Sequence, residues 1–169
     1  MSKLLGIRVV DLSLFLPGPM MTSMLADHGA EIIKIEPPGG DPARQMEPFE
    51  EGQSVWFRNI NRGKQSVVLD LKQKDNLQKL YRLVEESDIF VEAFRPGVAN
   101  RLKIDYETLS AINPRIIYCS ISAFGQDGPL AHHPAHDLAG EAFAGFMSVN
   151  DKGDGEPVVP AFPAADASA

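Results

Sequence analysis

Short runs of apolar residues alternate along the chain with segments in which apolar positions recur every three or four residues. The runs are rich in Val and Ile, which favours buried strands, and the spaced positions favour amphipathic helices. The pattern predicts strands over residues 7–12, 31–36, 66–71, 89–92 and 116–122, and helices over 17–28, 73–86, 105–112 and 137–147. Asp105 is the predicted N-cap of the third helix, and Gly29 is predicted to end the first.

Alternation of strand and helix predicts an α/β fold with a mostly parallel sheet and helices on both faces. The 169 residues fit one domain of ordinary size, and no internal repeat interrupts the pattern. Ligands of such folds bind at the carboxyl ends of the strands, where loops lead into helices. These loops are predicted at residues 13–19, 37–44, 92–97 and 123–134, and residues 150–156 are predicted to form an exposed turn.

Composition then narrows the class of protein. With 44% hydrophobic and 23% charged residues, the chain is typical of a globular domain. No apolar stretch approaches the roughly 20 residues that a membrane span needs, and the N-terminus lacks the apolar core of a secretory signal. We therefore expect no membrane partner and a cytoplasmic location. A net charge of −7 argues against general nucleic-acid binding, which needs a basic surface.

Sequence motifs for several common cofactors are missing. The chain has no glycine fingerprint for dinucleotides, no phosphate-binding P-loop and no nucleophile elbow. His132, His133 and His136 are close in sequence, but no cysteine and no H-E-x-x-H pattern joins them, so we expect no metal. Cys119 lies in an apolar run and is expected to be a buried structural thiol.

A few loop residues have the character of functional groups. Arg95 belongs to the segment Phe94-Arg95-Pro96-Gly97 that follows a predicted strand, which places it at the ligand-binding edge of the sheet. Arg62 and Lys64 flank Gly63, an arrangement that suits a diphosphate, although a surface turn explains it equally well. Asp166 lies among small apolar residues, so we expect it to be desolvated, with a raised pKa suited to acid–base or nucleophilic work. These features alone predict a small-molecule enzyme of unspecified chemistry.

Six segments of the chain carry a more specific signal when they are taken together. In order they read GIRVVDLSLFLPGPMMTSMLADHGAEIIKIEPPGGDPAR, NRGKQSVVLDLK, VEAFRPGVANRL, NPRIIYCSISAFGQDGPL, AHDLAGEAFAG and PAAD. The ordered set resembles the family III CoA-transferases, a group that includes α-methylacyl-CoA racemase. It covers nearly the whole chain.

The resemblance implies a Rossmann-like large domain, a smaller second domain and two subunits interlocked as rings. Family chains are more than twice as long as this one. We therefore expect residues 1–169 to be an N-terminal CoA-binding domain, without the second domain and the returning C-terminal segment. The resemblance also implies that the full-length protein is a homodimer. The small apolar residues at 160–169 are consistent with a fragment.

The resemblance assigns roles to three residues. Asp166 matches the family's catalytic aspartate, which in transferases attacks the thioester to form an anhydride and then a CoA thioester. It follows Asp137 by 29 residues, as the family spacing requires. In racemases the matching aspartate and a histidine exchange the α-proton, and His136 matches that histidine. A backbone N–H near Asp137 would stabilise the thioester oxygen.

Coenzyme A is expected as part of the acyl-CoA substrate, with a carboxylic acid as a possible acceptor. The positions that match the family's contacts with CoA phosphates and adenine are Arg95, Arg101, Leu69, Leu71, Lys72 and Phe94.

Two mechanisms stay open at this point. His136 with Asp137 favours a racemase, as does Leu16, where the formyl-CoA enzyme carries glutamine. The segment KIEPPGGDP at 34–42 favours a transferase, which is also the commoner activity of the family. A non-catalytic alternative, a CoA-binding or dimer-forming module, rests on the length of the chain.

Overall fold

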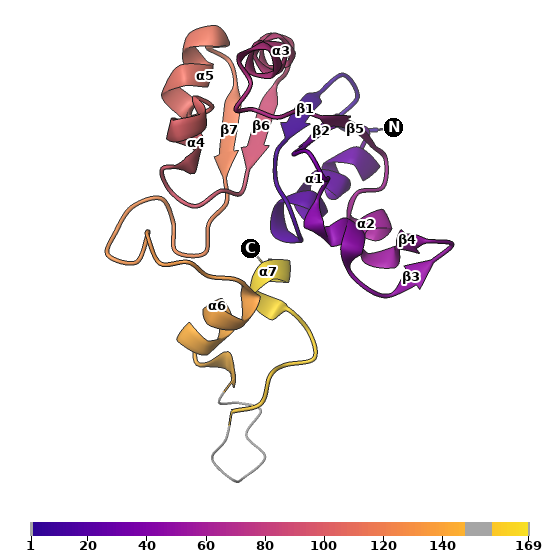
Figure 1. Cartoon of the computed structure of the whole chain (residues 1–169), viewed down its shortest axis with the longest axis vertical. Helices are drawn as coiled ribbons and strands as arrows, with labels where there is room; N and C mark the ends of the chain where they lie inside the picture. Colours follow the sequence, from indigo (N-terminus) through magenta and orange to yellow (C-terminus); the bar gives the residue numbers. More distant parts are fainter. Residues whose placement is uncertain (1, 148–156, 169) are drawn as a thin grey trace.

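The computed structural model describes residues 2–147 and 157–168. Its centre is a five-stranded sheet of order β5-β2-β1-β6-β7, in which every pair of neighbouring strands is parallel. The strands are β1 (Arg8–Asp11), β2 (Glu31–Glu36), β5 (Lys64–Val68), β6 (Ile89–Glu92) and β7 (Ile117–Ser120). The predicted α/β fold with a parallel sheet is confirmed (Figure 1).

Helices cover both faces of this sheet. The main ones are α1 (Pro17–Asp27), α3 (Lys74–Glu85) and α5 (Tyr106–Ile112). Val9 and Val10 are neighbours on β1, so they face opposite sides, and both are completely buried. Val9 packs with Leu25 of α1, whereas Val10 packs with Leu80 of α3. Burial on both faces explains why the central strands read as continuous apolar runs.

The end of α1 is closed by the predicted glycine. Gly29 has a φ of +95°, a left-handed conformation that glycine adopts without steric cost. Its N–H donates to the carbonyl of Ala26 at 2.8 Å, and the N–H of Ala30 donates to the carbonyl of Leu25 at 3.0 Å. These two bonds satisfy carbonyls that the helix end leaves without helical partners, and they turn the chain directly into β2.

Two predicted boundaries were wrong. β5 spans 64–68 rather than 66–71, because the Leu69 N–H makes a last bond to β2 and a turn closed on the Asp70 carbonyl follows. The helix predicted over 137–147 is α6 (Asp137–Phe143), which ends before Gly145 takes a φ of +76°. The predicted cap at Asp105 is confirmed, since its side chain accepts from the Thr108 N–H at 3.0 Å. The turn predicted at 150–156 lies outside the described residues.

Several short elements were not predicted, because two to six residues are too few to show a helical or strand period. They are the 3-10 turn η1 (Pro42–Gln45), the hairpin of β3 (Phe49–Glu50) and β4 (Gln53–Ser54), and the helices α2 (Val55–Ile60), α4 (Val98–Leu102) and α7 (Ala164–Ser168). Local signals explain two of them. Ser54 caps α2 by accepting from the Phe57 N–H, and Gly97 turns the chain into α4 with a φ of +84°.

α6 and α7 lie together beyond the carboxyl ends of β6 and β7 (Figure 1). α7 packs on α6 and on α1. Ala167 of α7 joins Leu16 and Ile60 in a small apolar cluster. These contacts hold the last described helix at the edge of the sheet where ligands of such folds bind. In the described part of the chain, no helix combines the length and the hydropathy needed to cross a membrane.

Candidate active site

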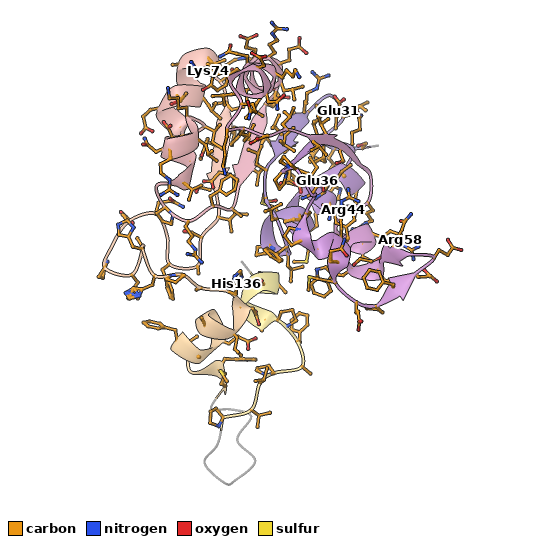
Figure 2. All side chains as sticks on the ribbon, viewed as in Figure 1. Glu31, Glu36, Arg44, Arg58, Lys74 and His136 are labelled. Atoms are coloured by element: carbon orange, nitrogen blue, oxygen red, sulfur yellow. The ribbon has the colours of Figure 1, made fainter. Side chains whose placement is uncertain are left out.

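A cleft of about 850 Å³ lies at the carboxyl edge of the sheet, where the sequence predicts the ligand-binding loops. Loops that follow β1, β6 and β7 form one wall, and α6 and α7 form the other. Its lining includes all three residues with predicted catalytic roles, His136, Asp137 and Asp166, together with Phe15 and Arg95. Figure 2 shows His136 between the sheet-bearing part of the molecule and α6. The fold therefore brings the predicted catalytic residues to one site.

Asp166 lies in the middle of α7 and is half-buried. Its backbone N–H donates to Oδ1 of Asp137 at 3.0 Å, so the first residue of α6 holds the segment that carries Asp166. Burial raises the pKa of the Asp166 carboxyl, and the neighbouring Asp137 carboxylate raises it further, while His136 opposes the shift. The expected desolvation is thus present. A carboxylate with a raised pKa is a stronger base and nucleophile than one in water.

Glu141 also acts on this segment, and the sequence reasoning missed it. It lies one turn after Asp137 on α6, and only 2% of the residue is exposed. Its Oε1 accepts the backbone N–H of Ala164 at 2.9 Å, and its charge is a further cause that raises the pKa of Asp166. The one signal in the sequence was the spacing of two acidic residues at i and i+4, which places them on one side of a helix.

Asp11 holds the start of the loop between β1 and α1. Its completely buried carboxylate accepts from the Ser13 N–H at 2.9 Å and from Nζ of Lys64 at 3.1 Å. Burial lowers the pKa of Lys64 to about 8, against the opposing effect of the Asp11 charge. Arg62 pairs with Asp27. Arg62 and Lys64, the two cations beside Gly63, therefore both have protein partners, which favours a structural role for this turn over a diphosphate site.

Lys34 and Asp41 fix the next part of the same loop. Nζ of Lys34 lies 2.9 Å from the Asp41 carboxylate and donates to the Ser13 carbonyl at 2.8 Å, and both charged side chains are buried. Phe15 follows with a φ of +63°. This left-handed conformation costs a residue other than glycine about 1–2 kcal/mol. The buried ion pair therefore supports a strained residue in the wall of the cleft.

Leu16 and Gly18 show how tightly this loop is packed. Leu16 is buried against Ala43 and Ile60 and does not line the cleft. Gly18 passes so close to Ser13 that an added Cβ would lie 2.2 Å from the serine Cβ, so only glycine fits. The wall is thus formed by Leu14, Phe15 and Pro17 around an inward-facing Leu16.

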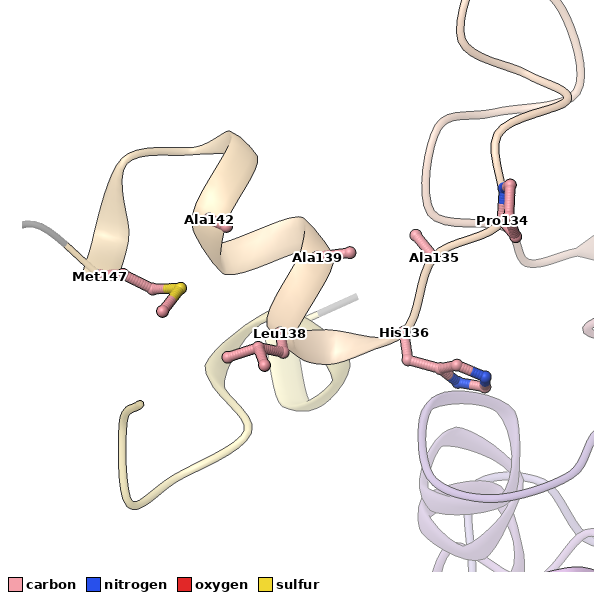
Figure 3. Close-up of a pocket in the computed structure, with 7 residues that line it drawn as sticks. All are labelled: Pro134, Ala135, His136, Leu138, Ala139, Ala142 and Met147. Atoms are coloured by element: carbon pink, nitrogen blue, oxygen red, sulfur yellow. The ribbon is translucent and has the colours of Figure 1, made fainter. Parts of the chain in front are cut away.

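His136 is exposed and stands at the start of α6, where its ring meets the ring of Phe15. Within the described residues, neither imidazole nitrogen has a hydrogen-bond partner. A second hollow, of about 560 Å³, is lined by apolar residues of α6 and of the segments on either side of it, and also by His136. Figure 3 shows the imidazole pointing away from Leu138 and Met147 of this hollow. The ring is therefore directed toward the cleft that it shares with Asp166.

Comparison with known proteins decides the family. A family model described as CoA-transferase family III matches residues 4–169. The chain belongs to CoA-transferase family III. The resemblance carried by the six ordered segments is thereby confirmed.

Two named relatives are CoA-transferases. Acetyl-CoA:oxalate CoA-transferase from Acetobacter aceti is 48% identical over 153 residues, which are 90% of this chain and 39% of that protein. Succinyl-CoA:glutarate CoA-transferase from Mus musculus is 39% identical over 162 residues, 95% of this chain and 37% of that protein. The chain thus spans about two fifths of the length of these curated relatives.

Solved structures agree with this assignment. The crystal structure of Rv3272 from Mycobacterium tuberculosis matches with a TM-score of 0.91 at 37% identity, over 98% of this chain and 46% of that chain. A CAIB/BAIF family protein from Brucella suis also gives a TM-score of 0.91 at 37% identity, over 98% of this chain and 45% of that one.

The positions predicted to bind CoA in this family III chain differ in what they expose. Arg95 lines the cleft. Arg101 and Lys72 are exposed, and they lie in the segments that follow β6 and β5. None of these three cations has an ion-pair partner among the described residues. Phe94 lines the cleft and packs on the core, whereas Leu71 packs on the core and does not line the cleft. Leu69 is buried as a whole, and its N–H is bonded to the Glu36 carbonyl, so it offers little surface to a ligand.

In residues 2–147 and 157–168, no group of three or more His, Cys, Asp or Glu side chains is arranged so that it could hold a metal ion. Cys119 is half-buried, and burial raises the pKa of its thiol, with the Glu92 carboxylate acting in the same direction. A thiol with a raised pKa is a poor nucleophile, which agrees with the structural role predicted for it.

Proposed function

We propose that this chain carries the acyl-accepting half of a family III CoA-transferase, and that Asp166 is its nucleophile. The observation that carries the proposal is the position of Asp166, which is half-buried and lines the cleft. Its backbone N–H donates to Oδ1 of Asp137 at 3.0 Å, and burial and the Asp137 charge raise the pKa of its carboxyl. Membership of the family and the names of the two CoA-transferase relatives support the reaction class.

The proposed reaction needs only carboxylate and thiolate exchange. The Asp166 carboxylate attacks the thioester carbonyl of the acyl-CoA, the C–S bond breaks, and CoA leaves as a thiolate from a mixed anhydride. The thiolate then attacks the aspartyl carbonyl of the anhydride, which releases the donor acyl group as a carboxylate and leaves a CoA thioester on Asp166. An acceptor carboxylate then attacks the aspartyl-CoA thioester, which forms a second mixed anhydride and releases the CoA thiolate. The thiolate attacks the acyl carbonyl of this anhydride, which gives the new acyl-CoA and regenerates the Asp166 carboxylate. No oxidant or net proton is required.

We place CoA along the carboxyl edge of the sheet, with Arg95, Arg101 and Lys72 as the groups that bind its phosphates. Exposed cations without protein partners can pair with phosphate oxygens at little cost, whereas a buried or paired cation would first have to lose its partner. Arg95 lines the same cleft as Asp166, so it connects the CoA region to the acyl-transfer site.

A second candidate function rests on His136. Its imidazole lines the cleft with Asp166, and neither nitrogen is hydrogen-bonded within the described residues. Such a pair could remove and return the α-proton of an acyl-CoA from opposite faces, which is racemase chemistry. The racemase reaction requires His136, whereas the transferase reaction does not use it.

The two functions are separated by tests on the native-length protein. Incubation with an acyl-CoA donor and then hydroxylamine should leave a hydroxamate on Asp166 if it accepts the acyl or CoA group, and Asp166→Ala should abolish CoA transfer. Racemase activity would instead incorporate solvent deuterium at the α-carbon without exchange of CoA. Replacing His136 by Ala should abolish deuterium uptake if the protein is a racemase, and should leave CoA transfer largely intact if it is a transferase. Absence of both signals would exclude both functions.

A further inference from the structure

Two carboxylates of α6 bind the first turn of α7. Oδ1 of Asp137 accepts the N–H of Asp166 at 3.0 Å, and Oε1 of Glu141 accepts the N–H of Ala164 at 2.9 Å. The two donors are two residues apart on α7, and the two acceptors are one helical turn apart on α6. The segment that carries Asp166 is therefore held at two points by side chains of one neighbouring helix.

The bond to the Ala164 N–H does not by itself require Glu141 to be charged. The residue is 2% exposed, and its second oxygen, Oε2, has no hydrogen-bond partner within the described residues. Burying a carboxylate costs several kcal/mol, and a buried oxygen without a partner adds to that cost. A glutamine would offer the same carbonyl acceptor to the Ala164 N–H without burying a charge. The charge of Glu141 therefore needs a role beyond holding the helix.

We propose that Glu141 is a positioning residue for Asp166, which fixes the first turn of α7 and supplies a second negative charge beside the Asp166 carboxylate. The inference rests on the function proposed for Asp166. It adds a residue to the site that acts through Asp166 and does not line the cleft.

The other charged groups near Asp166 come from α6, from its N-cap and from the loop after β6. α6 contributes Asp137, its N-cap is His136, and the loop after β6 contributes Arg95 to the same cleft. α1 also packs on α7, but its residue in the cleft lining is Pro17, which carries no charge. Glu141 is therefore one of two carboxylates that make Asp166 more basic, and it is the one that is shielded from solvent.

The test compares Glu141→Gln and Glu141→Asp in the native-length protein. Gln keeps the acceptor and removes the buried charge, so the melting temperature should equal or exceed that of wild type. The acid limb of the kcat/KM profile should move to lower pH by about half a unit, because one charge that raises the pKa of Asp166 is gone. Asp keeps the charge but is one methylene too short, so its acid limb should stay in place while kcat falls about tenfold or more.

The exposed Glu85→Gln is the control for loss of one negative charge and should match wild type in both measurements. An unshifted acid limb in Glu141→Gln overturns the proposal. So does a Glu141→Gln protein that cannot fold, since the charge would then serve stability, and so does a Glu141→Asp enzyme with wild-type kcat. Asp166→Ala is assayed in parallel. If that variant keeps CoA transfer, the proposed function itself fails; if it is inactive while Glu141→Gln is unshifted, only the role of Glu141 fails.

Discussion

The ring of Phe15 meets the imidazole of His136 edge-on, with 5.8 Å between the ring centroids and 77° between the planes. This contact joins the loop after β1 to the start of α6, two segments that are 121 positions apart in the sequence. Aromatic pairs of this geometry contribute about 0.5–1.5 kcal/mol beyond their buried area. The backbone of Phe15 is in the left-handed region where it makes this contact, so this part of the cleft wall carries a conformational cost.

Paired substitutions of Phe15 can separate the backbone strain from the ring contact. Phe15→Ala and Phe15→Gly both remove the ring, but only glycine adopts a φ near +63° without strain. Relief of about 1–2 kcal/mol should match or exceed the entropy that glycine adds to the unfolded chain, about 0.4–1 kcal/mol. We expect Phe15→Gly to be at least as stable as Phe15→Ala in urea denaturation. A glycine variant clearly less stable than the alanine variant would contradict the strain.

Close packing of α6 on α7 predicts an unusual effect of Gly140→Ala. A Cβ at residue 140 would lie 3.2 Å from the Cβ of Ala165, so α7 must shift by a few tenths of an ångström. Helix propensity favours alanine by about 1 kcal/mol, so the melting temperature should hold or rise. The CoA transfer proposed for this protein should fall several-fold, because the proposed nucleophile Asp166 is the next residue along α7.

Ala139→Gly is the matched control for this experiment. Ala139 is the preceding residue of α6 and is exposed. Its replacement should lower the free energy of unfolding by about 1 kcal/mol and leave kcat unchanged. Full activity in Gly140→Ala would show that the placement of Asp166 does not depend on this contact.

The buried pair of Lys34 and Asp41 should be far more important for stability than an exposed ion pair. Lys34→Met leaves the Asp41 carboxylate buried and removes a donor from the Ser13 carbonyl, so we expect a loss of about 3–5 kcal/mol in the free energy of unfolding. Adding Asp41→Asn should cost less than the sum of the two single changes, because the unpaired charge is gone. Urea denaturation of all three proteins measures this coupling.

Arg58→Ala provides the comparison, since the pair of Arg58 and Glu50 is solvent-exposed. Its loss should change the free energy of unfolding by less than about 1 kcal/mol. Equal effects of the two substitutions would mean that the Lys34 pair is not buried in solution.

The parallel sheet and its order of elements could be predicted from sequence because the deciding interactions are local or periodic. Continuous apolar runs mark strands buried on both faces, and Gly29 and Asp105 mark helix ends through bonds to residues a few positions away. The desolvation of Asp166 was also predictable, because small apolar neighbours cannot keep water around a carboxylate.

The buried charges could not be predicted in the same way. Lys34 and Glu141 have the spacing of ordinary solvated residues, and what buries them is packing between separate elements. Glu141 meets a donor 23 positions away on α7, a helix too short to show a period. Lys64 was recognised as a cation beside a glycine, but its partner Asp11 lies 53 positions earlier on another strand. Sequence pattern therefore pointed to residues that the fold brings to one cleft, and only the tertiary contacts identified the residues that hold them there.

Glu36 predicts how the stability of the fold depends on acidity. Its buried carboxylate accepts two bonds from Arg44, at 2.7 and 2.8 Å, one from the Asp41 N–H and one from the Ser66 hydroxyl (Figure 2). Burial alone would raise the pKa of Glu36, but these bonds outweigh it and lower the pKa to about 2 from 4.5. The unfolded chain therefore binds the proton more tightly than the fold does.

The sign of the effect follows from this difference. The stability that Glu36 contributes is complete above the unfolded pKa of 4.5 and is lost as the pH falls through the folded value of about 2. Between these values the urea midpoint of the wild-type protein should fall more steeply with decreasing pH than that of Glu36→Gln, which should also be less stable at pH 7. Glu50→Gln, in an exposed ion pair, should follow the wild-type curve closely. Parallel curves for wild type and Glu36→Gln would show that the bonds to Arg44 do not hold the proton off Glu36.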